Sequence, residues 1–157
     1  MQAHGIAAEL PAGFEGRIFK RQATGPELPC AVAHFATFAL PAVVADFGGG
    51  AVNVMGGGDV FAVLFEYGPA SVGTKLFARQ EMPRELGAGD FLPYVLRRGL
   101  PGQVGTQWFF TEVGRPFTLY VVLGSLTRRS TLVPRVNALL SGLAVLPAPA
   151  PLGAAWN

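Results

Sequence analysis

The chain has 157 residues, 50% of them apolar, with 12 Lys and Arg against 10 Asp and Glu and a formal net charge of +2. A chain of this length is typical of one globular domain whose core needs neither a disulfide nor a metal. High apolar content with low net charge excludes intrinsic disorder. Only 14% of the residues are charged, and no basic run is long enough to predict a nucleic-acid partner.

The single cysteine, Cys30, cannot close an intramolecular disulfide, which is compatible with a reducing compartment. Residues 1–16 have neither the basic nor the apolar region of a secretory signal. The longest apolar runs, such as residues 119–123, are far shorter than the roughly 18 to 20 residues that a membrane-spanning helix needs. The sequence therefore predicts a cytoplasmic protein with no transmembrane segment, with an export signal removed from a longer chain as the alternative.

Glycine and proline, 21 and 13 residues respectively, divide the chain into short segments with strand character. Residues 17–22 (RIFKRQ) carry charge and predict an edge strand. Residues 31–40 (AVAHFATFAL) are apolar on both faces and predict a central strand, with a buried helix as the alternative. Residues 51–55 and 59–67 flank three glycines, which predicts a hairpin.

A second hairpin is predicted for residues 105–113 and 116–124, joined by a type II′ turn at Gly114 and Arg115. If Val113 faces Pro116, one face of this hairpin is core, with Phe109 opposite Tyr120 and Thr111 opposite Thr118 on the other. The core face carries Trp108, Phe110, Phe117, Leu119, Val121 and Leu123. The outer face carries Gln107, Phe109, Thr111, Thr118, Tyr120 and Val122.

A helix is predicted for residues 131–141, because leucine and valine recur there at spacings of three and four. Its apolar face consists of Leu132, Val136, Leu139, Leu140 and Leu143. Ser130 or Thr131 can cap its start, and Gly142 stands where a left-handed stop is expected. A shorter helix is predicted for residues 91–98, capped by Asp90.

These elements predict an α+β fold, with an antiparallel sheet of about six strands, one main C-terminal helix and one or two short helices packed on it. Residues 1–13 are expected to form a flexible N-terminal arm and residues 14–146 a single domain. Residues 147–157, rich in proline and alanine, are expected to form an extended tail.

Few residues could carry metal or nucleophilic chemistry. Cys30, His34 and His4 are too few for a closed zinc site, so we expect no metal and no cofactor. His34 is expected to be a hydrogen-bonded structural residue. Glu66 ends an apolar strand and is expected to pair with an arginine there, with a catalytic carboxylate as the alternative.

The last part of the chain resembles small α+β proteins of the PsbP/Mog1-like kind. The residues that carry this resemblance are 114–125 (GRPFTLYVVLGS) followed by 132–145 (LVPRVNALLSGLAV). The resemblance implies a non-catalytic accessory, adaptor or chaperone-like module, although a shared fold fixes no partner. No functional residue of these proteins can be matched to a position of this chain.

The sequence thus predicts a non-enzymatic protein-binding or assembly module, with a protein partner or a second copy as its ligand. Its predicted binding residues lie on the outer hairpin face and are Gln107, Phe109, Thr111, Thr118 and Tyr120, because aromatic centres with polar edges are typical of interfaces. One alternative is that a helix or the N-terminal arm covers this face. Another is a small enzyme or ligand-binding protein with a pocket near Glu66, Tyr67 and Tyr94, and a third is a structural subunit.

Overall fold

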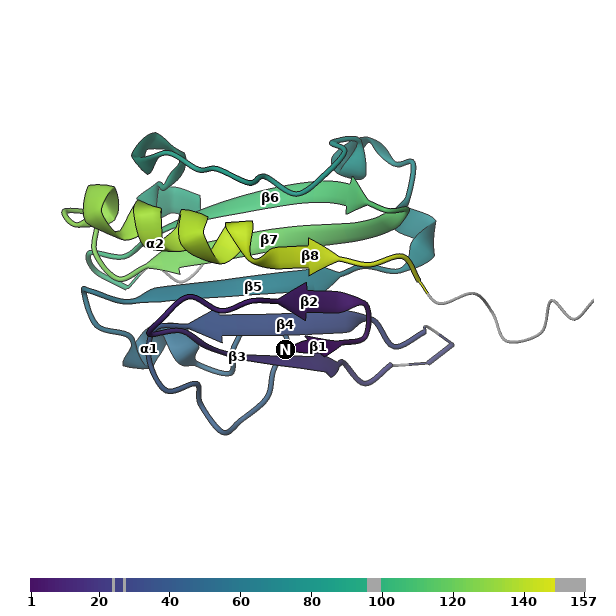
Figure 1. The fold of residues 1–157 in the computed structure, drawn as a ribbon, viewed down its shortest axis with the longest axis horizontal. Coiled ribbons are helices and arrows are strands. Elements are labelled where there is room, and N and C mark those ends of the chain that lie inside the picture. Colours follow the sequence, from purple (N-terminus) through teal and green to yellow (C-terminus); the bar gives the residue numbers. More distant parts are fainter. Residues whose placement is uncertain (24, 27, 96–99, 149–157) are drawn as a thin grey trace, which may run out of the picture.

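The computed structural model describes residues 1–23, 25–26, 28–95 and 100–148. Two antiparallel sheets form the fold (Figure 1). The larger sheet has the strand order β3 (Glu15–Lys20), β4 (Ala31–Ala36), β5 (Val60–Glu66), β7 (Arg115–Leu123) and β6 (Val104–Glu112). The smaller sheet has the order β1 (Gln2–Ala3), β2 (Ile6–Ala8) and β8 (Leu143–Val145). The α+β class with an antiparallel sheet is confirmed.

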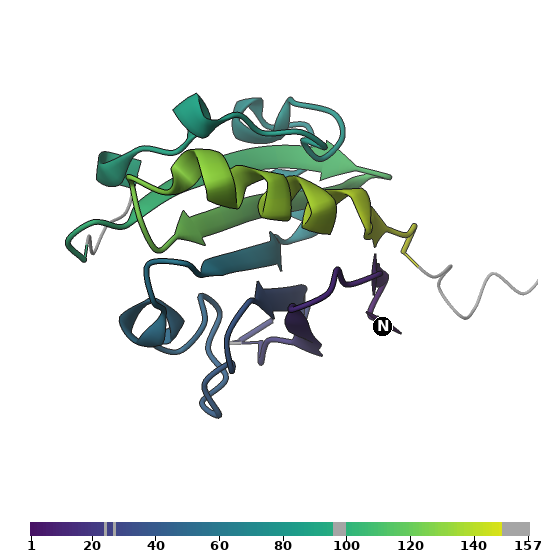
Figure 2. The ribbon, with the colours of Figure 1, turned by 60° about the vertical axis from the view of Figure 1, so that its left-hand side comes forward.

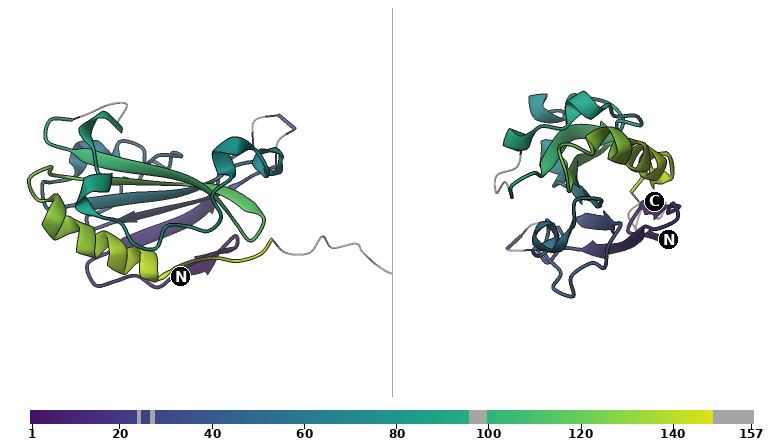
Figure 3. Two further views of the ribbon diagram at one scale, coloured as in Figure 1. Left: turned by 90° about the horizontal axis from the view of Figure 1, so that it is seen from above. Right: turned by 90° about the vertical axis from the view of Figure 1, so that its left-hand side faces the viewer.

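The main helix, α2 (Arg129–Ser141), leads directly into β8 and lies with the small sheet on the concave side of the large sheet (Figures 2 and 3). The five residues predicted for its apolar face are all buried. The predicted cap is wrong, because the helix begins after Arg128 and no side chain caps it. None of the described helices is long and apolar enough to cross a membrane.

Gly142 does end α2, but not in the predicted left-handed conformation, because its φ is −93°. Its role is close approach instead. A Cβ at this position would collide with the backbone oxygen of Glu9, whose N–H donates to the Gly142 oxygen at 2.9 Å. Glycine is therefore needed where the chain before β3 crosses the end of the helix.

The large sheet has an apolar core on each face. The first core lies between the sheet and the layer formed by α2 and the small sheet, and its largest members include Phe35, Leu64, Phe110, Phe117 and Leu139. The second core lies on the opposite face, where α1 (Ala51–Val54) packs against β5 and β7. All six residues of β4 are buried between these cores, which confirms the predicted central strand over residues 31–36, while residues 37–40 lie beyond its end.

The predicted first hairpin is wrong in one arm. Residues 59–67 do contain a strand, β5, but residues 51–54 form α1, whose Ala51 is buried in the second core. The three glycines that follow therefore join a helix to a strand. The predicted edge strand is confirmed as β3, which lies at one border of the large sheet.

The second hairpin forms, but its turn is not the predicted one. Val113 and Gly114 both have positive φ, 47° and 75°, as a type I′ turn requires, and Arg115 begins β7 opposite Glu112. Phe109 consequently faces Thr118, not Tyr120. The register differs from the prediction by two residues, so each side chain stays on its predicted face.

Two further segments differ from expectation. Residues 1–13 contribute β1 and β2 to the small sheet, and Ile6 is fully buried in the first core, so this segment is not a flexible arm. In the region predicted as a short helix, Leu92 bridges to Gly105 and Pro93–Val95 form a single 3-10 turn. The predicted helix start at residue 91 is wrong, while residues 96–98 and most of the predicted tail lie outside the described residues.

Candidate functional site

The end of the large sheet next to the small sheet carries an arginine–glutamate pair. Arg115, the first residue of β7, is joined to Glu66, the last residue of β5, by bonds of 2.7 Å from Nε and 2.9 Å from Nη2. The two side chains are only 9% and 16% exposed. The prediction that Glu66 is a strand-end ion-pair partner is confirmed.

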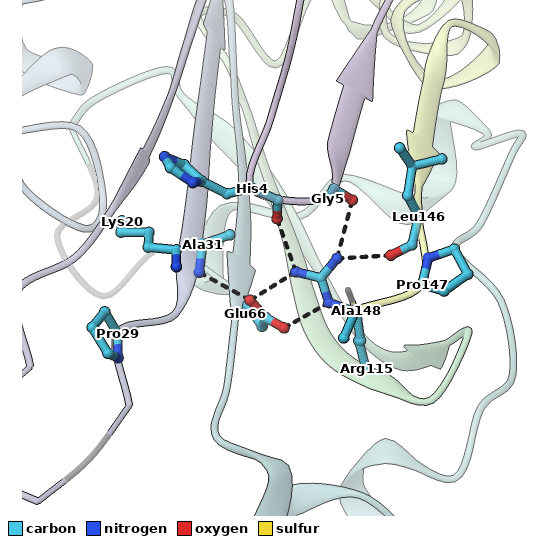
Figure 4. Close-up of a pocket in the computed structure, with 10 residues that line it drawn as sticks. All are labelled: His4, Gly5, Lys20, Pro29, Ala31, Glu66, Arg115, Leu146, Pro147 and Ala148. Atoms are coloured by element: carbon cyan, nitrogen blue, oxygen red, sulfur yellow. Dashed lines mark hydrogen bonds and ion pairs between the residues drawn. The ribbon is translucent and has the colours of Figure 1, made fainter. Parts of the chain in front are cut away.

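The guanidinium group of Arg115 also holds three backbone oxygens from the two ends of the chain (Figure 4). Nη1 donates to Gly5 at 3.1 Å and to Leu146 at 2.8 Å, while Nη2 donates to His4 at 3.1 Å. An arginine has five N–H donors, and these bonds use all of them. Arg115 therefore ties the β1–β2 turn and the end of β8 to the large sheet.

A shallow pocket of about 450 Å³ opens beside this pair (Figure 4). Its ten lining residues are His4, Gly5, Lys20, Pro29, Ala31, Glu66, Arg115, Leu146, Pro147 and Ala148. Glu66 is engaged as well as Arg115, because its Oε2 accepts the N–H of Ala31 at 2.9 Å. The charged pair is thus committed to holding the chain together, and this arrangement favours a structural role over acid–base chemistry.

The pocket differs from the one expected near Glu66, Tyr67 and Tyr94. Neither tyrosine lines it. Tyr94 follows Leu92, which bridges to Gly105 at the start of β6, and this is the opposite end of the sheet from Glu66. The three residues therefore do not form one site.

On the face of the large sheet that carries the second core, six aromatic rings are in contact with one another. We call this set the aromatic face. Its members are Phe47, Phe65, Tyr67, Phe77, Phe109 and Tyr120. Phe47 stacks on Phe65 with 5.3 Å between ring centroids and meets the edge of Tyr120 at 6.0 Å. Phe77 packs against Phe109 at 5.6 Å. Two segments that follow β4 and β5 thus add rings to those of the strands.

The five predicted binding residues all belong to this side of the sheet, but they differ in exposure. Gln107 is exposed, and Phe109 and Tyr120 are half-buried. Thr111 and Thr118 are buried, and their hydroxyl groups donate to the backbone oxygens of Phe77 and Trp108. These two threonines hold the sheet and its covering segment together. Only Gln107, Phe109 and Tyr120 therefore remain accessible.

Neither tyrosine of the aromatic face forms a hydroxyl hydrogen bond with another described residue. Burial raises the pKa of Tyr120, and it also raises the pKa of Tyr67, against the opposing effect of the nearby Arg21 cation. Arg21 itself lies over the ring of Phe65, 4.8 Å from the centroid. The face therefore combines apolar rings, two neutral hydroxyl groups and one cation.

Within β4, His34 is fully buried and hydrogen-bonded at both ring nitrogens, which confirms its predicted structural role. Nε of Arg17 donates to Nδ1 at 3.2 Å, so Nε2 carries the proton and donates to the backbone oxygen of Asp46 at 2.9 Å. Burial lowers the pKa of His34, and the Arg17 charge acts in the same direction.

Neither a metal site nor a related protein indicates a function for this chain. Within the described ranges, no three His, Cys, Asp or Glu side chains are grouped so that they could hold one metal ion. Comparison of the chain with protein-family models, with curated proteins and with solved structures found no match.

The partners that sequence reasoning missed come from distant segments. Arg115 was placed in a turn, and Phe47 and Phe77 lie in segments with no clear periodicity. Only their aromatic character, in stretches between predicted strands, could have indicated that they cover the sheet.

Proposed function

We propose that this protein is a non-enzymatic protein-binding module and that the aromatic face is its binding surface. The observation that supports this most directly is the incomplete burial of a contiguous set of rings. Phe47 is 47% exposed, and Tyr67, Phe109 and Tyr120 are half-buried. Rigid aromatic side chains are enriched at interface centres, where they contribute large contact areas at a small loss of conformational entropy.

The two segments that cover the sheet also carry exposed aliphatic side chains. They are Val43, Val44 and Val54 in the segment after β4, and Val72 and Leu76 in the segment after β5. Exposed apolar side chains that gather in one patch are typical of sites where another protein binds. The proposal therefore includes these side chains as the border of the interface.

The chemistry of the face defines the partner that would fit it. Apolar side chains of the partner would pack against the rings, and polar groups at the edge would bond to the hydroxyls of Tyr67 and Tyr120. Arg21, which is held against Phe65, adds positive charge to this face. We therefore propose a protein partner with an apolar centre and an acidic residue at its edge.

Two substitutions test this surface with little effect on the fold. Phe47→Ser removes the most exposed ring, and Tyr120→Phe removes a hydroxyl group while keeping the ring. Tyr94→Ser is the matched control, because Tyr94 is 81% exposed and lies in the 3-10 turn Pro93–Val95, outside the aromatic face. Melting temperatures check that all three variants fold.

The experiment captures partners with the full chain from the cells that produce it and then measures the affinity of the purified partner by calorimetry. We expect Phe47→Ser to weaken binding by about tenfold or more, which corresponds to about 1.4 kcal/mol. Tyr120→Phe should weaken it less, and Tyr94→Ser should leave it unchanged. Equal binding by the wild-type chain and Phe47→Ser would contradict the proposal.

A further inference from the structure

The outer border of β3 has backbone groups that no described residue bonds. The N–H of Arg21 donates to the oxygen of Cys30 at 3.1 Å. This bond determines which residues of β3 are hydrogen-bonded to β4. In an antiparallel pair the bonded positions alternate, so Glu15, Arg17 and Phe19 bond to β4. The N–H and C=O groups of Gly16, Ile18 and Lys20 consequently point away from the sheet, and among the described residues they have no partner.

The opposite border of the sheet is bonded to another segment near both of its ends. Gly105 of β6 exchanges two backbone bonds with Leu92, of 2.9 and 3.2 Å. Near the other end, Thr111 donates to Arg79 at 2.8 Å and accepts from Glu81 at 2.9 Å. The segment between β5 and β6 thus bonds both ends of this edge, whereas the outer groups of β3, at the lower border in Figure 1, are bonded by no described residue.

We propose that β3 of a second copy of this chain pairs antiparallel with β3, giving a two-fold dimer in which the two large sheets are continuous. In the proposed register, Ile18 lies opposite Ile18 of the second copy, and Gly16 lies opposite Lys20. The three outward residues of each copy then each donate one bond to the other copy, six in all. Every unpaired group on this edge would be used.

The side chains of β3 are self-complementary in this register. Glu15 lies opposite Arg21 of the second copy, and Arg17 lies opposite Phe19. Both pairs occupy non-hydrogen-bonded positions, where facing side chains approach most closely. Among the described residues, the carboxylate of Glu15 accepts one bond, at Oε1 from the N–H of Leu40, so Oε2 is available to Arg21 of the second copy once that side chain leaves the ring of Phe65.

Neighbouring registers are disfavoured by charge. A shift by two residues in one direction places Arg17 opposite Arg17 of the second copy, and a shift in the other direction places Arg17 opposite Arg21. Like charges directly opposite one another destabilise a strand pair. Charges on edge strands commonly prevent uncontrolled pairing, and here they leave one favourable register.

The first test removes backbone bonds without touching the existing sheet. Lys20→Pro deletes an N–H that points outward, so the β3–β4 ladder stays intact while the dimer loses two of its six bonds. Lys20→Thr is the matched control, because it removes the charge and keeps the N–H. By sedimentation equilibrium of the full chain, Lys20→Pro should raise the dimer dissociation constant about tenfold or more, and Lys20→Thr should change it much less.

The second test exchanges charges. Glu15→Arg and Arg21→Glu should each weaken the dimer about tenfold, and an equimolar mixture of the two variants should form a heterodimer with the wild-type affinity. Glu85→Arg and Lys75→Glu, at exposed positions elsewhere, control for net charge. Melting temperatures show that the variants fold.

A wild-type chain that remains monomeric up to about 1 mM overturns the proposal, and so does a mixture of the two charge variants that fails to associate. The Phe47→Ser variant separates this inference from the proposed partner surface, because it leaves β3 unchanged and should dimerise as the wild type does.

Discussion

Glu66 and Arg115 stand at the ends of adjacent strands and form a two-bond ion pair whose arginine also holds the backbone oxygens of His4, Gly5 and Leu146. These three oxygens belong to the β1–β2 turn and to the residue after β8. The pair therefore joins the small sheet to the large one, at the point where the two ends of the domain meet.

Replacing Arg115 should be strongly destabilising. Arg115→Ala leaves the Glu66 carboxylate without its partner and frees three backbone oxygens, and breaking a buried pair in this way costs about 3–5 kcal/mol. Urea unfolding measures the free energy, with Arg128→Ala, at an exposed position, as the control. A loss below about 1 kcal/mol would show that the pair behaves as an ordinary surface ion pair.

Gly142→Ala should destabilise the chain by about 1–3 kcal/mol, because the added methyl group meets the Glu9 backbone and the two segments must separate. The φ of −93° is accessible to alanine, so the effect reports steric contact alone. Gly89→Ala has open space around it and should stay within about 0.5 kcal/mol of the wild type. Thermal unfolding of both variants makes the comparison, and equal melting temperatures would refute the close approach.

Leu139→Ala should lower the free energy of unfolding by about 2–5 kcal/mol, because Leu139 is fully buried between α2 and the sheet and its truncation leaves a cavity. Thr131→Ala, on the exposed side of the same helix, should change it by less than about 0.5 kcal/mol. Similar small effects in urea unfolding would mean that the helix face has been misassigned.

The stability of the protein should fall as the pH falls below about 6.5, the ordinary pKa of histidine. Burial lowers the pKa of His34 in the folded chain, so in this range the unfolded chain binds more protons. The His34 contribution is complete above pH 6.5 and is lost as the pH decreases toward the folded-state pKa. In His34→Gln, the free energy of unfolding, measured from pH 8 to pH 5, should decrease less than it does in the wild type. An unchanged slope in the variant would assign the effect to other groups.

Much of the local structure followed from the pattern of residues. Continuous apolar character predicted β4, because a strand buried on both faces needs apolar side chains in every position. Spacings of three and four predicted α2 and its buried face. The alternation in the last hairpin placed each side chain on the correct face even though the turn was misassigned, since a register error of two residues leaves the faces unchanged.

Tertiary contacts decided the remainder. Residues 51–54 are as compatible with a strand as with the helix that forms, and the choice depends on how Ala51 packs against β5 and β7. The turn lies at Val113 and Gly114 because Arg115 then enters the strand beside Glu66, a contact between residues far apart in the sequence. The aromatic face likewise combines Phe47 and Phe77 with rings from three strands. Local periodicity reports which side of an element is buried, whereas the partner it meets is set by long-range packing, which no local pattern encodes.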